Sequence, residues 1–464
     1  MRHPPPLARK SVVLAPQTRP ELLDLELSVV TPLFGGGIEP GQVDDVLPVR
    51  ASSIRGHLRF WWRACRGHTY PSAARLFADE SAIWGKTHTG NGSGGPSDIE
   101  VEVTILKAGR PLQCVTYEPV TRPNGHVRWR PHWGPYPAYA LFPFQGEAED
   151  DHEPSTWGKP PREALSGVRF RLRLTAAPHV AAQRVADLRE AAEAAVWAWV
   201  TFGGVGARTR RGCGSLYCAD QRFSPGQADP GDWISDAVDR HAPGETNPTC
   251  PRLPFLAGGR LLLQRRANGP LPDLVAWGAA VNLMRDFRQR PDYGRDPGPG
   301  LSRWPEADSL RNLTRASPGH APSDADLKYF PRAELGLPIV FHFKDAGDPP
   351  DYSLEVDKYQ ASRMASPIIL KPLAVSPERG YPMALLLDAP FIADLAGEGH
   401  PFPLRLRPRE HTEEFPVANP ADVFDPTKAA HVTPLTRAGA TNARAAFVGF
   451  VRQEWNGQMQ EVEL

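Results

Sequence analysis

The sequence predicts an α+β protein made of tandem ferredoxin-like (RRM-like) βαββαβ units, with a long insertion in the first unit. Strand-like and helix-like segments follow one another in the order strand, helix, strand, strand, helix, strand over the first half, and similar segments recur in the second half. The 464 residues suffice for two or three domains. We therefore expect a flexible leader at residues 1–20, a first unit at 21–225 with an insertion at about 107–165, and a second unit at 226–464.

The elements of the first unit are predicted from the spacing of apolar residues. Alternation of apolar and polar side chains predicts strands at residues 22–30, 99–106, 168–175 and 215–218. Apolar residues at helical spacing predict helices at residues 54–66 and 183–200. Ser52 and Ser53 offer N-cap side chains to the first helix. Residues 107–165 are rich in proline and aromatic residues, which is typical of an insertion.

The second unit is predicted from a weaker version of the same pattern. Strands are expected at residues 260–265, 337–343, 367–373 and 383–387, and helices at 272–288 and about 442–455. Residues 290–305 form a loop rich in proline, glycine, aspartate and arginine.

Composition excludes several classes of protein. The 53 basic and 53 acidic residues give a net charge of zero, which argues against a general polycation and directs attention to local clusters. Five cysteines without a Cys-x-x-Cys pair fit neither a zinc ribbon nor a disulfide scaffold, and indicate a reducing compartment. The first residues lack the apolar core of a signal peptide, and no long apolar run occurs. We expect a soluble, cytoplasmic protein with no metal and no cofactor.

The most informative segment is FGGVGARTRRGCG, the glycine–arginine loop (residues 202–214), which holds five glycines and three arginines. Glycines allow close approach of the backbone to a ligand, and guanidinium groups suit phosphates. The loop lies in an acid-free window and follows a helix, so it is not a dinucleotide-binding fingerprint. A glycine-rich turn packed on a helix would explain Gly203 and Gly204, but not Arg208, Arg210 and Arg211.

The helix at residues 54–66 carries the arginine stripe, defined as Arg55, Arg59, Arg63 and Arg66 at positions i, i+4, i+8 and i+11. No acid occurs between Val46 and Ala78, so the stripe reads as a face of one sign. Such a face suits a polyanion or an acidic protein neighbour; an internally paired face is the alternative. Phe60, Trp61 and Trp62 beside it are expected mostly in the core; stacking of one of them on a base is the less favoured alternative.

Catalytic constellations are few. His57 lies among the arginines and is a candidate general base, although a phosphate or backbone contact is the simpler interpretation. Asp44 and Asp45 occupy the loop after the first strand, where a carboxylate can polarise a ribose hydroxyl or hold a metal. Adjacent loop acids are more often turn formers. No residue is assigned a catalytic role.

Three motifs, TPLFGGG (residues 31–37), RASSIRGHLRFWWR (residues 50–63) and GGVGARTRRG, resemble the RAMP superfamily of CRISPR–Cas proteins. Within it they are most similar to the first RAMP subunits of the Cmr, or type III-B, effector complex. The segments RWPEADSLR, LGLPI and RMASPIILKP resemble the C-terminal half of those subunits. The resemblance spans about residues 22–390.

This resemblance implies tandem ferredoxin-like folds and a place near the 3′ end of the crRNA. It also implies a role in capturing target RNA and contacts with neighbouring RAMP subunits of the complex. In that family the slicing carboxylate belongs to a sister subunit, in the loop to which Asp44 and Asp45 correspond here. Comparison with the crRNA-processing RAMP enzymes would instead make His57 catalytic.

The leading hypothesis from the sequence is a non-catalytic RNA-binding and assembly subunit that contacts crRNA and single-stranded target RNA. The alternatives are a RAMP-type endoribonuclease acting on crRNA or target RNA, and an arginine stripe that faces an acidic protein. The expected RNA contacts are Arg50, Arg55, His57, Arg59, Arg63, Arg66, Gly203, Gly204, Gly206, Arg208, Arg210, Arg211, Gly35 and Gly36.

Overall fold

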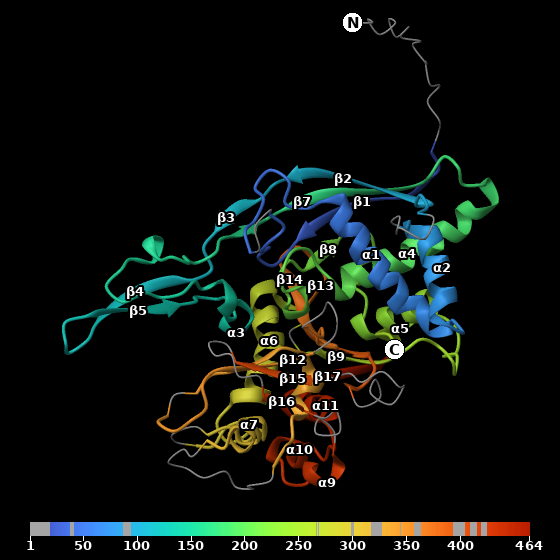
Figure 1. The fold of residues 1–464 in the computed structure, drawn as a ribbon. Coiled ribbons are helices and arrows are strands. Elements are labelled where there is room, and N and C mark those ends of the chain that lie inside the picture. Colours follow the sequence, from blue (N-terminus) through green and yellow to red (C-terminus); the bar gives the residue numbers. More distant parts are fainter. Residues whose placement is uncertain are drawn as a thin grey trace, which may run out of the picture.

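The computed structural model is a mixed α/β protein in which the strands of every sheet pair antiparallel (Figure 1). The structure describes residues 19–37, 41–86, 94–265, 267, 269–297, 301–316, 327–343, 345–356, 363–392, 404–408, 415–418 and 425–464. The expected leader, apart from its last two residues, lies outside the described residues.

The first sheet has the strand order β2-β7-β1-β8. Its strands are β1 (Glu21–Val29), β2 (Ile99–Lys107), β7 (Arg169–Ala176) and β8 (Leu216–Cys218). The crossing helices are α1 (Ala51–Arg66), between β1 and β2, and α4 (Val185–Phe202), between β7 and β8. All six elements were expected within a few residues of these bounds. The expected N-cap is wrong, because α1 begins at Ala51 after Arg50, and no side chain caps it.

The second sheet has the order β10-β14-β9-β17, and β13 also pairs with β14. Its strands are β9 (Phe255–Gln264), β10 (Leu271–Pro272), β13 (Ile368–Ala374), β14 (Arg379–Asp388) and β17 (Met459–Glu463). The helices α6 (Asp273–Gln289) and α11 (Ala443–Glu454) contact each other, and α6 packs on β13 and β14. Without β10, the order β13-β14-β9-β17 repeats that of the first sheet.

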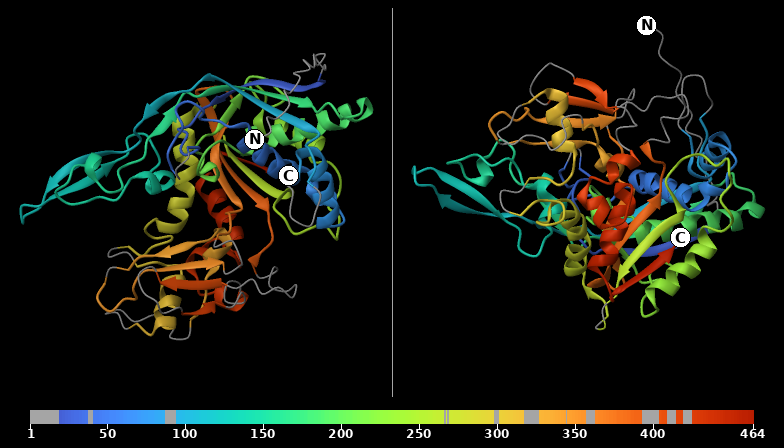
Figure 2. Two further views of the ribbon diagram at one scale, coloured as in Figure 1. Left: turned by 45° about the horizontal axis from the view of Figure 1, so that its top comes forward. Right: turned by 90° about the horizontal axis from the view of Figure 1, so that it is seen from below.

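A third sheet lies at the end of the molecule away from the first one (Figure 2). Its order is β11-β12-β15-β16, from β11 (Ile339–Phe341), β12 (Tyr352–Val356), β15 (Leu404–Pro408) and β16 (Phe415–Ala418). The strand expected at residues 337–343 therefore belongs to this sheet and not to the second one. Its apolar residues form a core of their own with Leu310 of α7 (Glu306–Thr314).

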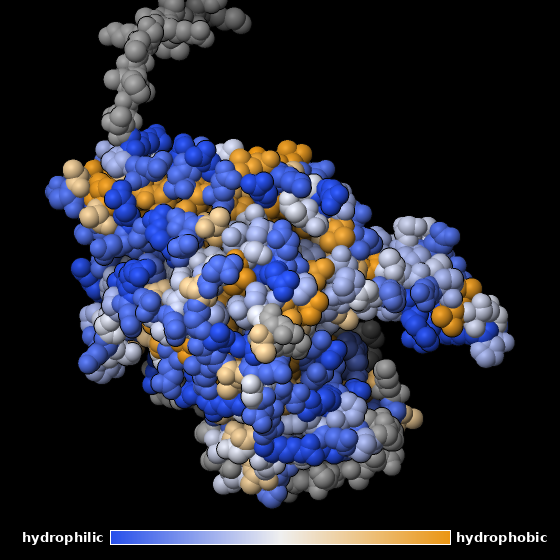
Figure 3. All heavy atoms as spheres, turned by 180° about the vertical axis from the view of Figure 1, so that it is seen from behind, coloured by the Kyte–Doolittle hydropathy of each residue, from blue (hydrophilic) through white to orange (hydrophobic). Residues whose placement is uncertain are grey.

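Residues 107–165 project from the body as an arm (Figures 1 and 3). At its base β3 (Arg110–Leu112) pairs with β6 (Ala164–Ser166), and beyond them β4 (Thr116–Thr121) pairs with β5 (Val127–His132). The short helix α3 (Ala138–Leu141) returns the chain to α6. The other α-helices of four or more residues in the described part of the chain are α2 (Ala73–Trp84), α5 (Pro230–His241), α9 (Pro426–Ala429) and α10 (Thr433–Arg437).

Helices α1 and α4 form a layer that both larger sheets share. They contact each other, α4 contacts β1 and β13, and α1 contacts β9. This explains why every residue from Ala194 to Phe202 is buried, whichever side of the helix it occupies. Lys371 of β13 closes the end of the helix, because its Nζ donates to the carbonyls of Val200, Thr201 and Gly203 at 2.8–3.1 Å. Those carbonyls have no partner within the helix.

Candidate nucleic-acid interface

The glycine–arginine loop lies beside the TPLFGGG segment. Thr31 Oγ1 donates to the carbonyl of Gly212 at 2.6 Å, and it accepts from the backbone N–H of Ser215 at 2.8 Å. The backbone N–H of Ala207 donates to the carbonyl of Phe34 at 2.6 Å. Two segments that are distant in sequence are thus joined through their backbones.

The glycines of the loop are required by close packing. A Cβ at Gly212, where φ is +77°, would lie 2.6 Å from Trp277 Cδ1, and one at Gly203 would lie 2.6 Å from Trp61 Nε1. Gly203 and Gly204 are buried, so their backbones are covered by protein, whereas Gly206 is exposed. Close packing therefore accounts for all five glycines, against Trp61 of α1, Trp277 of α6 and backbone carbonyls of the loop and of Phe34. Among the five, only Gly206 is exposed.

Two of the three loop arginines, Arg210 and Arg211, donate to carbonyls in the second half of the chain, whereas Arg208 lies over the Phe142 ring of the arm. The Arg210 guanidinium donates to the carbonyl of Ser366 and lies over the Phe60 ring of α1, 5.5 Å from its centroid. Arg211 Nη1 donates to the carbonyl of Ile368 at 2.9 Å. These carbonyl acceptors orient the guanidinium groups without neutralising their charge.

Burial acts on all three cations. It lowers the pKa of Arg210 to about 10 and, as the largest cause, that of Arg211 to about 10. The pKa of Arg208 is also lowered by burial. Each side chain remains charged at neutral pH, and an unneutralised charge away from water is costly. The loop thus holds three buried guanidinium charges, and a bound anion would offset the cost of burying them.

These arginines line a cavity of about 1130 Å³, the arginine cavity. Its other walls come from the base of the arm, from the C-terminal half of α6 and from residues 332–342 and 363–366. None of the described residues that line it is acidic. Its basic lining residues are Arg208, Arg210, Arg211, Arg285, Arg288, Arg332, His342 and Arg363.

Carboxylates just outside the lining neutralise some of these cations. Arg332 pairs with the buried Glu306 at 2.9 Å, and Arg285 pairs with Asp286 at 2.7 Å. His342 contacts Asp351 at 2.5 Å. The loop arginines have no carboxylate partner among the described residues. Net positive charge therefore remains inside the cavity.

The arginine stripe has a different environment. Glu80 of α2, only 2% exposed, contacts Arg59 at 2.7 Å and Arg63 at 2.8 Å. The expectation of a face of one sign is therefore wrong, because the acid that pairs with the stripe lies just beyond the acid-free window. None of the four stripe arginines lines the arginine cavity. The helix that carries the stripe contacts the loop through other residues: Phe60 lies beside Arg210, and Trp61 packs against Phe202 and Gly203.

Some of the other residues around α1 that were expected to contact RNA already contact protein side chains. Arg50 Nη2 pairs with Asp44 at 2.9 Å, and backbone N–H groups and Arg50 together lower the pKa of that carboxyl. His57 lies against Trp199 with ring centroids 6.2 Å apart, and burial lowers its pKa. Arg55 and Arg66 have no carboxylate partner among the described residues, and Arg55 Nε is buried without a hydrogen bond.

The glycines of TPLFGGG differ in accessibility. Gly35, at φ +72°, is buried and its Cβ would lie 3.2 Å from Ala207 Cβ, so it allows the two loops to approach. Gly36 is exposed. Only Gly36 of this pair is therefore open to a ligand.

The sequence-based prediction missed the arginines that the second half contributes. Arg285 and Arg288 are one helical turn apart on α6, Arg332 lies in a short 3-10 helix (Pro331–Leu335), and Arg363 lies in a loop. The RDFRQR run at the end of α6 was the one available signal, since it places two arginines on the same helix face. Nothing in the sequence indicates that this face lies opposite the glycine–arginine loop.

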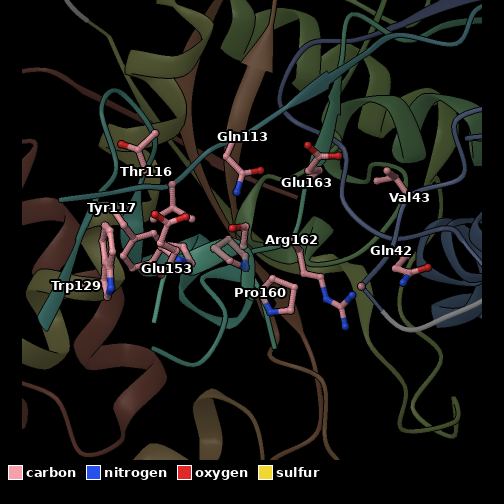
Figure 4. A pocket seen from close by; sticks show the side chains of 15 residues that line it. Gln42, Val43, Gln113, Thr116, Tyr117, Trp129, Glu153, Pro160, Arg162 and Glu163 are labelled. Carbon is pink, nitrogen blue, oxygen red and sulfur yellow. The ribbon is translucent and has the colours of Figure 1, made fainter. Parts of the chain in front are cut away.

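A second cavity, of about 780 Å³, lies at the base of the arm (Figure 4). Tyr117 and Trp129 lie toward one end and Gln42 and Val43 toward the other. Its lining combines Arg162 with the carboxylates of Glu153 and Glu163. This mixed charge makes it a poorer site for a polyanion than the arginine cavity.

The described residues contain neither a cluster of metal ligands nor a membrane-spanning helix. No three or more histidine, cysteine, aspartate or glutamate side chains among them are grouped as metal ligands would be. Of the helices in that part of the chain, none has both the length and the apolar character needed to cross a membrane.

Comparison with known proteins gives a family match for part of the chain. Residues 26–217 match the model of the RAMP superfamily. This range runs from β1 through α1, the arm and α4 to the glycine–arginine loop. No curated protein matches the sequence.

Solved structures with a similar course of the chain include Cmr1 from Pyrococcus furiosus in its apo form. It is 14% identical with a TM-score of 0.42, over 86% of this chain and 94% of that chain. A chain of the type III-B Cmr-beta complex bound to cognate target RNA and AMPPnP in the presence of ssDNA gives 14% identity and a TM-score of 0.40, over 79% and 94%. A chain of the Cmr-beta complex bound to cognate target RNA is 11% identical with a TM-score of 0.41, over 78% of this chain and 94% of that chain.

Proposed function

Starting from the match of residues 26–217 to the RAMP superfamily, we propose that this chain is a non-catalytic RNA-binding and assembly subunit of a type III-B CRISPR (Cmr) effector complex. It holds single-stranded RNA, either crRNA or target RNA, beside other RAMP subunits of the complex in the cytoplasm. The motifs TPLFGGG and SIRGHLRFWWR support the choice of complex. The arginine cavity is the observation that carries the RNA-binding function.

The same proposal includes two ferredoxin-like units, at residues 21–225 and 226–464. The strand order β2-β7-β1-β8 with helices α1 and α4 supports the first unit. The order β13-β14-β9-β17 with α6 and α11 supports the second, whose third sheet is then an insertion. In this arrangement the arginine cavity lies where the two units meet.

The physical basis of binding is neutralisation of phosphates. A phosphodiester chain carries one negative charge per nucleotide, and cations that contact it release bound counterions. The guanidinium groups of Arg210 and Arg211 donate to carbonyls of the second half, so little ordering of these two side chains is needed on binding. Such contacts to phosphates imply weak preference for base sequence.

Catalysis is not assigned to the three candidates that the sequence offered, Asp44, Asp45 and His57. The Asp44 carboxylate is already bound by Arg50 and by two backbone N–H groups. His57 packs on Trp199 in a site where burial favours its neutral form. The ribonuclease alternative is tested by incubating the purified chain with labelled crRNA and target RNA, with and without magnesium. Discrete products that disappear on Asp45→Asn or His57→Gln would overturn the non-catalytic assignment.

The decisive test of RNA binding is its dependence on salt. We expect the affinity of the full chain for single-stranded RNA to fall steeply as salt rises, and the Arg208→Gln, Arg210→Gln double variant to lower the slope of log affinity against log salt by about 1 to 2. Arg128→Gln with Arg130→Gln, on the exposed face of the arm, is the control with the same change of charge. A slope unchanged in the first variant, or lowered equally in both, would remove the cavity from the interface.

A further inference from the structure

The arginine cavity holds more positive charge than a passing RNA chain requires. Five of its lining cations have no carboxylate partner among the described residues: Arg208, Arg210, Arg211, Arg288 and Arg363. They surround a space of about 1130 Å³, slightly above the range typical of pockets for single small ligands. An internal phosphodiester brings one charge, whereas a terminal phosphomonoester brings close to two at neutral pH.

Two donors inside the cavity are unpaired. Arg208 Nε and Arg288 Nε are buried without a hydrogen-bond partner, although Arg288 Nη1 donates to Tyr139 Oη at 2.7 Å. A buried donor left unpaired costs free energy, and a charged one costs more. Phosphate oxygens can accept two parallel bonds from a guanidinium, which would remove this cost.

The backbone also places one of these donors under strain. Arg208 has φ +57° and ψ +31°, a left-handed conformation that costs a non-glycine residue free energy. Strained residues of this kind gather at ligand sites. Glycine would adopt this backbone conformation at a lower cost in free energy. The presence of arginine at position 208 therefore points to a role for its side chain.

An aromatic ring lies beside the same arginine. Phe142 lines the cavity and is 54% exposed, and the Arg208 guanidinium lies 5.4 Å from its ring centroid. An exposed ring next to phosphate-binding cations is suited to stack on a base. A phosphate and a base from one nucleotide can thus be held together.

We propose that the arginine cavity binds the phosphorylated end of an RNA strand, with the terminal phosphomonoester between Arg208 and Arg288 and the last base on Phe142. This inference rests on the proposed RNA-binding function and adds the chemical group that is recognised. The phosphomonoester is the shared feature of a 5′ end, a 3′ end and a free nucleotide, and the experiment separates these sources.

The test measures binding of the full chain to single-stranded RNAs of about ten nucleotides that differ only in their ends. One RNA has hydroxyl groups at both ends, one a 5′ phosphate and one a 3′ phosphate, and AMP and pyrophosphate serve as competitors. We expect one phosphorylated RNA to bind at least about 10-fold more tightly than the hydroxyl form, as one added charge-assisted contact implies. AMP and pyrophosphate should compete only at far higher concentrations.

Variants test which residues give rise to the preference for a phosphorylated RNA end. Arg208→Gly should reduce the preference below about 2-fold while the melting temperature changes by no more than about 2 °C, because glycine relieves the left-handed strain. Phe142→Ala should weaken the binding of all three RNAs by about 10-fold. Arg128→Gln on the arm should leave the preference intact.

The outcomes separate this inference from the function on which it rests. Equal binding of the three RNAs would overturn the inference and leave RNA binding in place. No binding of any RNA at low salt would overturn the proposed function itself. Competition by AMP or pyrophosphate at concentrations equal to those of the phosphorylated RNA would show a free phosphate compound as the ligand, and would also overturn the inference.

Discussion

The arginine stripe of α1 and the glycine–arginine loop look alike in the sequence but differ in the fold. Each lies in an acid-free window, yet Arg59 and Arg63 meet the buried Glu80 of α2, whereas Arg210 and Arg211 donate to backbone carbonyls and have no carboxylate partner among the described residues. Charge of one sign along a segment therefore does not imply charge of one sign in space. The pairing acid decides which cluster stays available to a polyanion.

The largest effect is expected where the loop is fitted to α6. Gly212→Ala would place a Cβ 2.6 Å from Trp277 in a left-handed conformation, so we expect it to lower the free energy of unfolding by about 3 kcal/mol and to weaken RNA binding with it. Urea denaturation measures the first effect. Gly226→Ala is the control, since it has φ +57° with no atom within 4 Å, and it should cost about 1 kcal/mol. Equal costs would contradict the close fit of the loop.

The comparison between the two clusters is tested directly by matched neutral variants. Arg211→Gln should weaken binding of single-stranded RNA by about 10- to 100-fold, because a buried cation that faces the ligand is lost. Arg63→Gln should weaken it less than about 3-fold, because Glu80 already holds that cation. Fluorescence anisotropy at one salt concentration measures both, with melting temperatures as the control for folding. Equal losses would mean that both clusters bind RNA.

Changing the pairing acid tests the same comparison from the other side. Glu80→Gln should lower the free energy of unfolding by about 2 kcal/mol, because two arginines lose their buried acceptor. It should also raise RNA affinity slightly at low salt, since it frees positive charge on α1. Glu118→Gln on the exposed arm is the control, with an expected change below about 0.5 kcal/mol. A stable variant with unchanged affinity would mean that Glu80 does not control the stripe.

The smallest effect is expected at His57. Burial lowers its pKa below the ordinary value near 6.5, so the ring is neutral between about pH 6.5 and 8 and gives no cation to a phosphate. His57→Gln should change RNA affinity less than about 2-fold across this range. Since the unfolded chain binds this proton more readily, stability contributed by the neutral ring is present above pH 6.5 and is lost as the pH falls below it. A pH dependence of RNA affinity that vanishes in the variant would restore His57 as a contact.

Local patterns predicted the elements of the first sheet well. Leu25 and Leu27 alternate with acids and face Leu172 and Phe170 across β1 and β7, so their period of two reflects one buried face. The start of α1 was misjudged because Ser52 and Ser53 have good capping side chains, although the helix begins before them. The capping preference of a single serine therefore did not fix the first residue of the helix.

The site was predicted only in part, because many of its residues are far apart in the sequence. The loop arginines were visible because glycines and arginines crowd together in sequence. Arg288 and Arg332 were not, because the loop arginines with which they share the cavity come from the other half of the chain. Glu80 was overlooked for the same reason, since it lies on the next helix. Pairing across tens of residues leaves no local signal in one sequence.

The shared helical layer has a consequence for synthesis of the protein. Val196 and Trp199 of α4 are buried, yet β13, which covers part of this helix, begins only at Ile368. While the ribosome makes the intervening stretch, the nascent first half exposes an apolar helix surface that has no cover yet. Exposed apolar surface of this kind is prone to aggregate and is a target for chaperones. We therefore expect truncated chains that stop before β13 to need a chaperone to remain in solution, and full-length chains to release it.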